Sequence, residues 1–480
     1  MQQNREIFPR IVRKKSIFQE RFDEKPLKNC EYSEILFIFD LLMSDYLTLG
    51  EAGVYAVPVR EEDLAIAGGG MLLFSPLSGY IAAVEPGDVL MLQEVIAGSM
   101  PAATLPGAEQ LLEGLFAFGR EQVLHHYKEP GQSDTLSILP NQKCNFSCSY
   151  CYSAKGRSDS ELSQEALRAM LKYFIDPARI APCELNILIA GGGEPMLSWP
   201  LIHDGLDYAA ELAAEHGFKL YIRIITNGSI LNEEIILTLI RHRVRVCVSF
   251  EILEELQQQQ RGAFRQVHRH ILTLISRGII PEIFATITPA GVDRMEEMLE
   301  AVHQSFPEVQ KVNFDPVMDK RLFTDTEDLS AFYRSFTRNY FKAMEAFHDK
   351  GLETGNSILE KFSRLRDRFC PGYLCLTAEG TLSLCHKVSS PSDPAYDRYC
   401  YGSVTLSGKP DMDQAKYDRL LQYNAAHFSE CNDCFARWHC GGGCQACRDH
   451  FSEEQFRDVC NFHRDMLYKL LIRKLKNQPL

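Results

Sequence analysis

The sequence has no apolar run long enough to cross a lipid bilayer, which needs about 18 or more apolar residues in succession. The longest candidate, Ile35 to Met43, is short and is interrupted by Asp40. The first residues, Met1 to Lys15, are mixed and basic and contain no apolar segment of a secretory signal. We therefore expect a cytoplasmic protein with no membrane partner.

Basic residues are also too few for a typical nucleic-acid protein. The sequence has 51 Lys and Arg against 64 Asp and Glu, and its formal net charge is -13. Because binding to phosphate backbones requires a basic surface, we expect no nucleic-acid partner. Internal repeats are missing too, and we expect the one low-complexity run, Gln257 to Gln260, to be a loop or a helix surface.

The length and composition predict two to four globular domains, because the chain has 480 residues, 45% of them hydrophobic and 24% charged. Residues 1–130 mix short strands and helices, which predicts a small α+β module similar to a winged helix, or else a cap with no binding role. Pro58 cannot donate to a strand ladder, so it ends its strand or places it at an edge. The expected strands are Val54–Val57, Met71–Phe74 and Tyr80–Val84, and the expected helices lie near 88–97 and 108–118.

Residues 131–350 alternate between strands and helices. Six such units predict parallel strands with right-handed crossovers, an α/β barrel-type fold whose chemistry lies at the carboxyl ends of the strands. Ser163 is expected to cap the first helix, which runs to about Phe174. The expected strands are Thr135–Leu139, Leu185–Ala190, Leu220–Thr226, Val244–Phe250, Ile283–Thr288 and Lys311–Pro316, and later helices fall near 201–215, 232–242, 263–277, 293–305 and 328–348.

Cysteine is abundant, with 16 residues, and it is clustered. Three cysteines lie between 144 and 151, and ten lie between 370 and 460, in a loop-rich part, 351–480, that ends in a helix near 461–476. A cytosolic protein rarely keeps disulfides, so these clusters indicate metal binding or catalysis. The isolated cysteines, which we expect to be buried thiols, are Cys30, Cys183 and Cys247.

The first cysteine cluster, Cys144-Asn-Phe-Ser-Cys148-Ser-Tyr-Cys151, follows the first expected barrel strand. Three thiolates on one tight loop can hold three irons of a [4Fe–4S] cube and leave the fourth iron without a protein ligand. The alternative is a structural zinc loop with a distant fourth ligand, although zinc normally takes four closed ligands.

The CxxxCxxC spacing resembles the radical S-adenosylmethionine superfamily, and further motifs follow in order at the strand ends. Gly192-Gly193-Glu194-Pro195 resembles the family's GGE motif, which binds the amino group of the methionine moiety, and Thr226-Asn227-Gly228 resembles the motif after the third strand. The resemblance implies that the cofactor is contacted by Gly192, Gly193, Glu194, Asn227, Ser249 and Arg261.

One motif departs from the family pattern. Where relatives carry "SlDG", this chain has Ser249-Phe250-Glu251-Ile252, so glycine is lost and aspartate becomes glutamate. We expect the loop after this strand to be reshaped.

The second cysteine field is more specific. Its spacing, Cys370-x9-Gly380-x4-Cys385, then Cys431-x2-Cys434-x5-Cys440-x3-Cys444, then Cys460, resembles the seven-cysteine SPASM pattern of radical enzymes that act on peptides. A zinc ribbon would pair CxxC with CxxC, which fits these spacings poorly. The resemblance implies one auxiliary [4Fe–4S] cluster on Cys370, Cys385 and Cys444, and a second on Cys431, Cys434, Cys440 and Cys460.

The fourth ligand of the first auxiliary cluster is left open by the sequence. Some relatives carry another cysteine just before the position of Cys370, but none stands in Arg364 to Phe369. This cluster has either an open iron, which could bind a substrate thiolate, or a fourth ligand from Cys375, Cys400 or Cys447.

The resemblance implies a partial (β/α)6 TIM-like radical SAM barrel over 131–350, a SPASM domain over 351–480 and a leader-recognition-like domain over 1–130. It implies three [4Fe–4S] clusters and S-adenosylmethionine, from which a 5′-deoxyadenosyl radical abstracts hydrogen. The expected activity is maturation of a ribosomally made precursor peptide through a thioether or carbon–carbon crosslink. We expect its leader to add a strand beside Met71–Phe74 or Tyr80–Val84. A flavodoxin or ferredoxin is the expected electron donor, and no catalytic acid or base is identified.

Two other functions compete with this interpretation. An anaerobic sulfatase maturase would carry aspartate directly after the cysteine that matches Cys385, where this chain has His386. A non-enzymatic iron–sulfur electron carrier would need neither the GGE motif nor a barrel.

Overall fold

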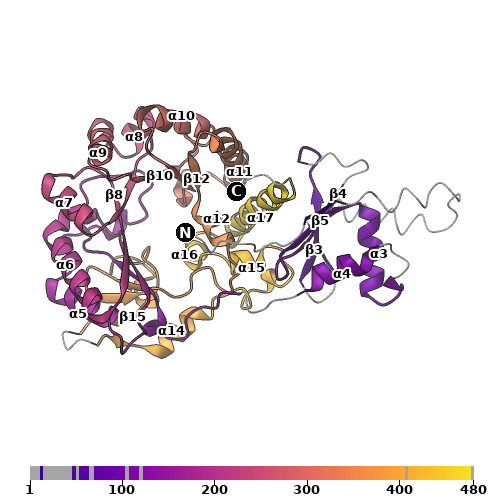
Figure 1. Ribbon diagram of the computed structural model, residues 1–480, viewed down its shortest axis with the longest axis horizontal. Coiled ribbons are helices and arrows are strands. Elements are labelled where there is room, and N and C mark those ends of the chain that lie inside the picture. Colours follow the sequence, from indigo (N-terminus) through magenta and orange to yellow (C-terminus); the bar gives the residue numbers. More distant parts are fainter. Residues whose placement is uncertain are drawn as a thin grey trace.

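The computed structural model of the protein describes residues 11–13, 46–49, 53–63, 70–102, 107–117, 123–405 and 409–476. The described strands form two sheets, one of five strands and one of eleven. Figure 1 shows the larger sheet inside an incomplete ring of helices, with the smaller sheet beyond helix α17.

Parallel strands form one side of the larger sheet, out to one of its edges, and each pairs with the next one along the chain. The six predicted barrel strands are confirmed to within one residue at each end. A seventh, β12, was missed because three residues are too few to show a period. These strands are β6 (Thr135–Ile138), β7 (Glu184–Ile189), β8 (Lys219–Thr226), β9 (Arg245–Ser249), β10 (Glu282–Ile287), β11 (Lys311–Pro316) and β12 (Glu353–Gly355).

Helices cover the outer face of these strands (Figure 1). They are α5 (Gln164–Phe174), α6 (Trp199–His216), α7 (Glu233–Arg241), α8 (Glu254–Gln260), α9 (Phe264–Ser276), α10 (Met295–Ser305) and α11 (Thr326–His348). The predicted cap of the first helix is confirmed, because the Ser163 hydroxyl accepts a hydrogen bond from the Ala166 amide at 3.1 Å. Apolar residues at helical spacing bury one face of α5.

The glutamine run is a helix surface at its two middle residues, which are exposed on α8 as predicted, but its first and last residues are buried. Gln257 is fully buried and Gln260 is 7% exposed, and both lie in α8. The Gln257 side chain accepts a hydrogen bond from the Glu251 amide at 2.9 Å and donates one to the Gly262 carbonyl at 2.8 Å. Glutamine is buried here because its amide satisfies backbone groups at both ends of a turn.

The larger sheet continues into the cysteine-rich part of the chain. Strand β13 (Leu374–Leu376) pairs in parallel with β6, and three antiparallel strands follow it, namely β14 (Thr381–Ser383), β15 (Cys400–Ser403) and β16 (Asp411–Met412). The helices here are α12 (Ser357–Phe362), α13 (Tyr396–Tyr399), α14 (Gln414–Leu421), α15 (Arg437–Cys440), α16 (Gln445–His450) and α17 (Glu453–Leu475). The last helix starts earlier than predicted because Ser452 and Gln455 form a capping box.

Single 3-10 turns complete the described part of the chain at Pro130–Gln132, Ala154–Gly156, Pro195–Ser198, Lys320–Leu322 and Ser429–Cys431. No helix among the described residues is both long enough and apolar enough to span a membrane.

The smaller sheet has the order β1-β5-β4-β3-β2 and is followed by helices α3 (Pro86–Ile96) and α4 (Ala108–Phe116). Phe118, at the end of the predicted second helix, lies outside the described residues. The strands are β1 (Ile11–Arg13), β2 (Leu47–Leu49), β3 (Val54–Val59), β4 (Gly70–Ser75) and β5 (Tyr80–Val84). Pro58 does not end β3. The pairing of β3 with β2 stops at Ala56, so at Pro58 a described strand, β4, lies on one side only.

Both faces of the smaller sheet are covered. One face, which includes Leu73 and Ala82, packs against α3 and α4. The other face, which includes Leu72 and Phe74, belongs to the main hydrophobic core. Phe74 stacks on His439 of α15, with ring centroids 5.9 Å apart.

The predicted docking edges are already paired, so that part of the sequence prediction is wrong. Strand β4, with Met71–Phe74, lies between β3 and β5. On β5, residues 81–83 pair with β1. Strand pairing uses the same backbone groups that an added peptide would need, so neither strand offers a free edge there.

Candidate active site

The loop that carries Cys144, Cys148 and Cys151 follows β6 and is fixed to the loop after β7. Asn141 is fully buried, and its side-chain amide donates to the Glu194 carbonyl at 3.0 Å and to the Ser198 hydroxyl at 2.7 Å. In return, the Glu194 amide donates to the Lys143 carbonyl at 2.6 Å. The cysteine loop therefore begins at a fixed position at the carboxyl end of the sheet.

This close approach explains two glycines of the GGE motif. A Cβ atom on Gly193 would lie 1.7 Å from the Lys143 carbonyl oxygen, and one on Gly192 would lie 2.5 Å from the Asn141 carbonyl oxygen. Gly192 also has a φ of +64°. Any side chain here would push the two loops apart, so the chain needs glycine at both positions.

Glu194 joins the ends of β7 and β8. Its side chain is 2% exposed and accepts hydrogen bonds from the Thr226 hydroxyl at 2.6 Å, the Asn227 amide at 2.7 Å and the Met196 amide at 3.1 Å. Burial raises the pKa of Glu194, while these hydrogen bonds oppose the shift. The carboxylate therefore acts within the protein as an anchor as well as offering charge to a ligand.

Asn145, which sequence analysis missed, links the cysteine loop to the end of β8. Its side-chain oxygen accepts a hydrogen bond from the side-chain amide of Asn227 at 2.9 Å. Its own side-chain amide donates to the Ser229 hydroxyl at 2.8 Å. The Ser229 backbone amide donates to the Asn227 side-chain oxygen at 2.9 Å. Its position between Cys144 and Cys148 was the only available sign of this role.

Arg157 is a second residue that sequence analysis missed. Its guanidinium donates to the Phe146 carbonyl at 2.8 Å and approaches the Cys151 sulfur at 3.4 Å. Burial opposes the charged form, but the hydrogen bond to Cys151 and the nearby thiols raise the pKa of Arg157 overall. A fixed cation beside three thiols suits an anionic group held by their thiolates.

The three thiols of the loop lie near one another and are partly buried. Burial has the largest effect on the pKa of Cys148 and raises it. The Arg261 charge lowers this pKa, and the Cys151 and Cys144 sulfurs raise it further. Among the described residues, no three Cys, His, Asp or Glu side chains form a group that could hold a single metal ion. A four-iron cluster is a wider body, because each thiolate binds a different iron.

A triad of the buried Glu251 with the partly buried Tyr150 and Arg261 lies beside this loop. The Tyr150 hydroxyl donates to Glu251, and the Arg261 guanidinium donates to the Tyr150 oxygen at 2.9 Å and lies 3.5 Å from the carboxylate. Burial raises the pKa of Glu251 to about 7, although Arg261 and the hydrogen bonds oppose the shift. Arg261 Nε is buried and has no hydrogen-bond partner in the described part of the chain.

The loop after β9 places a strained residue where the family motif has glycine. Ile252 stands at that position, and it has a φ of +68° and is 4% exposed. A β-branched residue in this region is strained by roughly 1–3 kcal/mol. The expected reshaping of this loop stays a prediction. Ser249, the last residue of β9, lies opposite Phe284 of β10 at the same end of the sheet.

The structure also brings together the cysteines of each proposed auxiliary group. Burial raises the pKa of Cys385, and the nearby Cys444 and Cys370 thiols add to the rise. In the other group, burial raises the pKa of Cys440, and the thiols that add to this rise are Cys460, Cys434 and Cys431. His463, which sequence analysis missed, lies with Nδ1 3.2 Å from the Cys440 sulfur.

The isolated cysteines behave differently from one another. Cys247 is fully buried in β9, as predicted. Cys183 is exposed, so the prediction for it is wrong. It lies directly before β7, where the chain has not yet entered the sheet. Cys30 lies outside the described residues.

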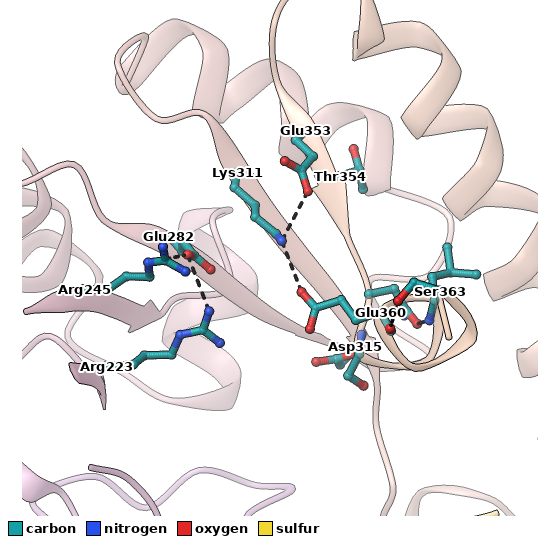
Figure 2. Close-up of polar contacts among 12 residues, drawn as sticks. Arg223, Arg245, Glu282, Lys311, Asp315, Glu353, Thr354, Glu360 and Ser363 are labelled. Carbon is teal, nitrogen blue, oxygen red and sulfur yellow. Dashed lines mark hydrogen bonds and ion pairs between the residues drawn. The ribbon is translucent and has the colours of Figure 1, made fainter. Parts of the chain in front are cut away.

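Charged side chains within the strands are a further feature that sequence analysis missed (Figure 2). Lys311 of β11 pairs with Glu353 of β12 at 3.2 Å and with Glu360 of α12 at 3.1 Å. Burial opposes the charge of Lys311, but the two carboxylates outweigh it and raise its pKa. On the neighbouring strands, Arg223 and Arg245 lie 3.9 and 3.7 Å from Glu282.

The parallel strands of the α/β sheet end at a three-cysteine loop, a glycine-glycine-glutamate turn and a partly buried arginine. Residues 138–304 match the family model of the Radical SAM superfamily. The chain therefore carries a radical SAM domain, which implies a [4Fe–4S] cluster and S-adenosylmethionine. The residues of the cysteine loop fit such a group, because its three thiols lie near one another with two partly buried arginines beside them.

The chain is similar to two curated proteins. It is 24% identical over 233 residues to an S-adenosylmethionine-dependent nucleotide dehydratase of Psychrobacter lutiphocae, a match that covers 45% of this chain and 76% of that protein. It is 27% identical over 133 residues to the radical SAM cyclopropyl synthase TigE of Paramaledivibacter caminithermalis, which covers 25% of this chain and 27% of that protein.

Among solved structures, the chain is similar to native anSMEcpe with bound AdoMet. The TM-score is 0.57 at 17% identity, and the match covers 72% of this chain and 99% of that one. This likeness shows a shared fold.

Proposed function

We propose that the protein is a radical S-adenosylmethionine peptide maturase of the SPASM type, which installs a thioether or carbon–carbon crosslink in a ribosomally made precursor peptide. The observation that carries the proposal is the presence of three separate groups of thiols in one chain, the first of which lies on a loop that is hydrogen-bonded to the GGE turn. A simple electron carrier would need no such turn. A peptide substrate is also supported by the similar structure of anSMEcpe with bound AdoMet and Cp18Cys peptide, TM-score 0.56.

In this proposal each thiol group holds one [4Fe–4S] cluster. The first cluster is held by Cys144, Cys148 and Cys151, the first auxiliary cluster by Cys370, Cys385 and Cys444, and the second by Cys431, Cys434, Cys440 and Cys460. S-adenosylmethionine contacts Gly192, Gly193, Glu194, Asn227, Ser249 and Arg261. When bound, these groups supply a 5′-deoxyadenosyl radical that takes hydrogen from an unreactive carbon.

The chain's own residues bind, orient and shield in this mechanism. Arg157 fixes the cysteine loop through the Phe146 carbonyl and the Cys151 sulfur. Glu194 keeps the ends of β7 and β8 together and supplies negative charge for an ammonium group. The unpaired Nε of Arg261 is a donor for a carboxylate, and the burial of these groups excludes water.

The proposal assigns leader recognition to residues 1–130, the radical chemistry to 131–350 and the auxiliary clusters to 351–480. Electrons come from a flavodoxin or ferredoxin. Formylglycine formation is the competing activity, but His386 follows Cys385 at the position where the sulfatase maturases carry aspartate. An imidazole in place of a carboxylate favours crosslinking over that reaction.

The test is reductive cleavage of S-adenosylmethionine by protein reconstituted without oxygen. Wild-type protein should contain about twelve irons and release 5′-deoxyadenosine after reduction. The Cys144→Ala, Cys148→Ala, Cys151→Ala triple variant should keep about eight irons and release none. Cys183→Ala, which removes an exposed cysteine, is the matched control and should behave as wild type. Cofactor cleavage by the triple variant at the wild-type rate, or stoichiometric zinc with little iron, would contradict the proposal.

A further inference from the structure

Three Cys-x2-Cys pairs in the chain share one local geometry. In each pair the amide of the second cysteine donates to the carbonyl of the first, and the distances are 3.2, 3.3 and 3.1 Å. The pairs are Cys148 with Cys151, Cys431 with Cys434, and Cys444 with Cys447. In the proposed function both cysteines of the first two pairs are cluster ligands, whereas in the third pair only Cys444 is assigned.

Cys447 lies next to two of the three thiols of the first auxiliary group. It is 5% exposed and lies in the first turn of α16, directly after Cys444. The Cys447 amide donates to the Cys444 carbonyl at 3.1 Å, and the two thiols are within hydrogen-bond reach of each other. The Cys385 thiol is also close enough to interact electrostatically with Cys447.

The other two candidates for the fourth ligand, Cys375 and Cys400, lie near fewer of the assigned thiols. Cys375 is buried in β13 opposite Ser383, and the only thiols that perturb it are those of Cys385 and Cys400. Cys400 begins β15, also opposite Ser383, and its sulfur lies 3.9 Å from the Thr381 hydroxyl. Both belong to the sheet interior, and of the three assigned thiols only that of Cys385 is near either of them.

A cation lies beside the Cys444 and Cys447 pair. Lys387 Nζ is 3.0 Å from the Met318 sulfur, and the Cys447 sulfur is 3.7 Å from the same atom. Lys387 also lies near the Cys444 and Cys385 thiols. A fourth thiolate adds one negative charge, and the partly buried Lys387 ammonium compensates it.

We propose that Cys447 is the fourth protein ligand of the first auxiliary cluster, so that this cluster is closed by four thiolates. The inference rests on the proposed assignment of Cys370, Cys385 and Cys444. It leaves no open iron for a substrate thiolate, and it confines substrate chemistry to the site beside Glu194 and Arg261.

The ligand can be tested without turnover, in the triple alanine variant that lacks the first cluster. This background should hold about eight irons. Into it we introduce Cys447→Ala, with Cys375→Ala and Cys400→Ala as matched buried controls. A cubane that lacks one thiolate loses its exposed iron on mild oxidation, so brief ferricyanide treatment should give the EPR signal of a three-iron cluster in the Cys447→Ala protein alone. Failure of the Cys447→Ala protein to retain the cluster, with about four irons left, supports the proposal if both controls keep eight.

Several outcomes would overturn it. A three-iron signal in the triple variant itself would mean that the iron is already open, and a signal with Cys375→Ala or Cys400→Ala instead would move the ligand to that residue. An unchanged spectrum in Cys447→Ala would exclude its role. About four irons in the background variant would mean that the first auxiliary cluster is absent. Release of 5′-deoxyadenosine by wild-type protein is measured separately, so that the radical chemistry can stand even if this ligand assignment fails.

Discussion

The carboxylate of Glu194 is committed to the Thr226 hydroxyl and the Asn227 amide at 2.6 and 2.7 Å. We expect Glu194→Ala to weaken S-adenosylmethionine binding by about 1.5–3 kcal/mol, roughly 10- to 100-fold, because both the charge and the link between β7 and β8 are lost. Equilibrium titration of the reconstituted enzyme measures this loss. Glu161→Ala removes a more exposed carboxylate that pairs with Lys143 in the neighbouring loop, and it should leave the affinity unchanged. Equal affinities for Glu194→Ala and wild type would show that the GGE turn does not serve the cofactor.

Glu251 makes the stability of the fold depend on pH. Burial raises its pKa to about 7 in the folded protein, so the folded state holds the proton more tightly than the unfolded state. The resulting stability is present at low pH and is lost as the pH rises through 7, by about 1 kcal/mol between pH 6 and pH 8. Glu251→Gln has no carboxyl group to titrate at this position. The difference in free energy of unfolding between wild type and this variant should therefore fall by this amount from pH 6 to pH 8. Denaturant unfolding at both pH values measures it.

The matched control for this experiment is Glu254→Gln, which changes an exposed carboxylate three residues away. Its difference from wild type should not vary between pH 6 and pH 8. A difference between wild type and Glu251→Gln that is independent of pH would mean that Glu251 keeps one protonation state over this range.

At the residue scale, the sequence identified those residues whose chemistry demands a particular type. Cysteines for iron and the glycines of the GGE turn are of this kind, because no other side chain fits beside the Lys143 carbonyl. Asn145 and Arg157 were not predicted, because a polar residue in a loop has no periodicity, and the partners of Asn145 lie far along the chain. The strain at Ile252 was hidden because it depends on backbone geometry that the residue type disfavours.

The cysteine loop is the element on which the chemistry depends, and Arg157 is its main internal support. We expect Arg157→Ala to weaken retention of the first cluster by roughly 10- to 100-fold, because the Phe146 carbonyl and the Cys151 sulfur lose their donor. The rate of iron loss to a chelator, followed by the visible absorbance of the cluster, measures this effect.

Arg168→Ala is the matched control for the loop, because Arg168 is an exposed arginine on α5 that pairs with Asp204. It should lose iron at the wild-type rate. If Arg157→Ala also behaves as wild type, the loop is held without the guanidinium, and the Asn145 and Asn141 contacts suffice.

At the element scale, long apolar strands were predictable and short ones were not. Strands β7, β8 and β10 alternate buried and more exposed residues over six to eight positions, and β6, β9 and β11 each carry a run of three buried residues. Strands β12 and β13 have three residues each, and their pairing depends on neighbours from elsewhere in the chain. Within the glutamine run of α8, the burial of Gln257 was not predicted, because it follows from hydrogen bonds and not from polarity.

At the scale of the whole molecule, the smaller sheet is held firmly to the rest of the protein. Lys469 of α17 pairs with Asp63 at 2.6 Å, and Phe74 stacks on His439. Removal of residues 1–130 would therefore expose part of the main core. The proposed leader recognition has to be tested with the intact enzyme.

We expect a core peptide without its leader to be a poor substrate for the intact enzyme. Remote binding energy from the leader would be missing, so the specificity constant kcat/KM should fall at least about tenfold, while uncoupled release of 5′-deoxyadenosine should continue. Mass spectrometry of the modified peptide measures this, with the full precursor as reference and the free leader added in trans as control. Equal processing of both peptides would mean that the smaller sheet is a structural cap. A leader that adds a strand would have to displace β1 or use β2, because β4 is paired on both sides.

The pairing of β13 with β6 has a consequence for electron flow. Strand β6 leads directly into the loop of Cys144, and β13 lies between Cys370 and Cys385, so one continuous ladder of hydrogen bonds joins the two regions. Tunnelling rates fall exponentially with the gap between redox centres, and a shared sheet keeps such a gap constant while loops and peptide move. If both regions hold clusters, binding of a substrate cannot change the rate of electron transfer by moving the donor toward the acceptor. It can change that rate only through the driving force, which depends on charge and water near the sulfurs.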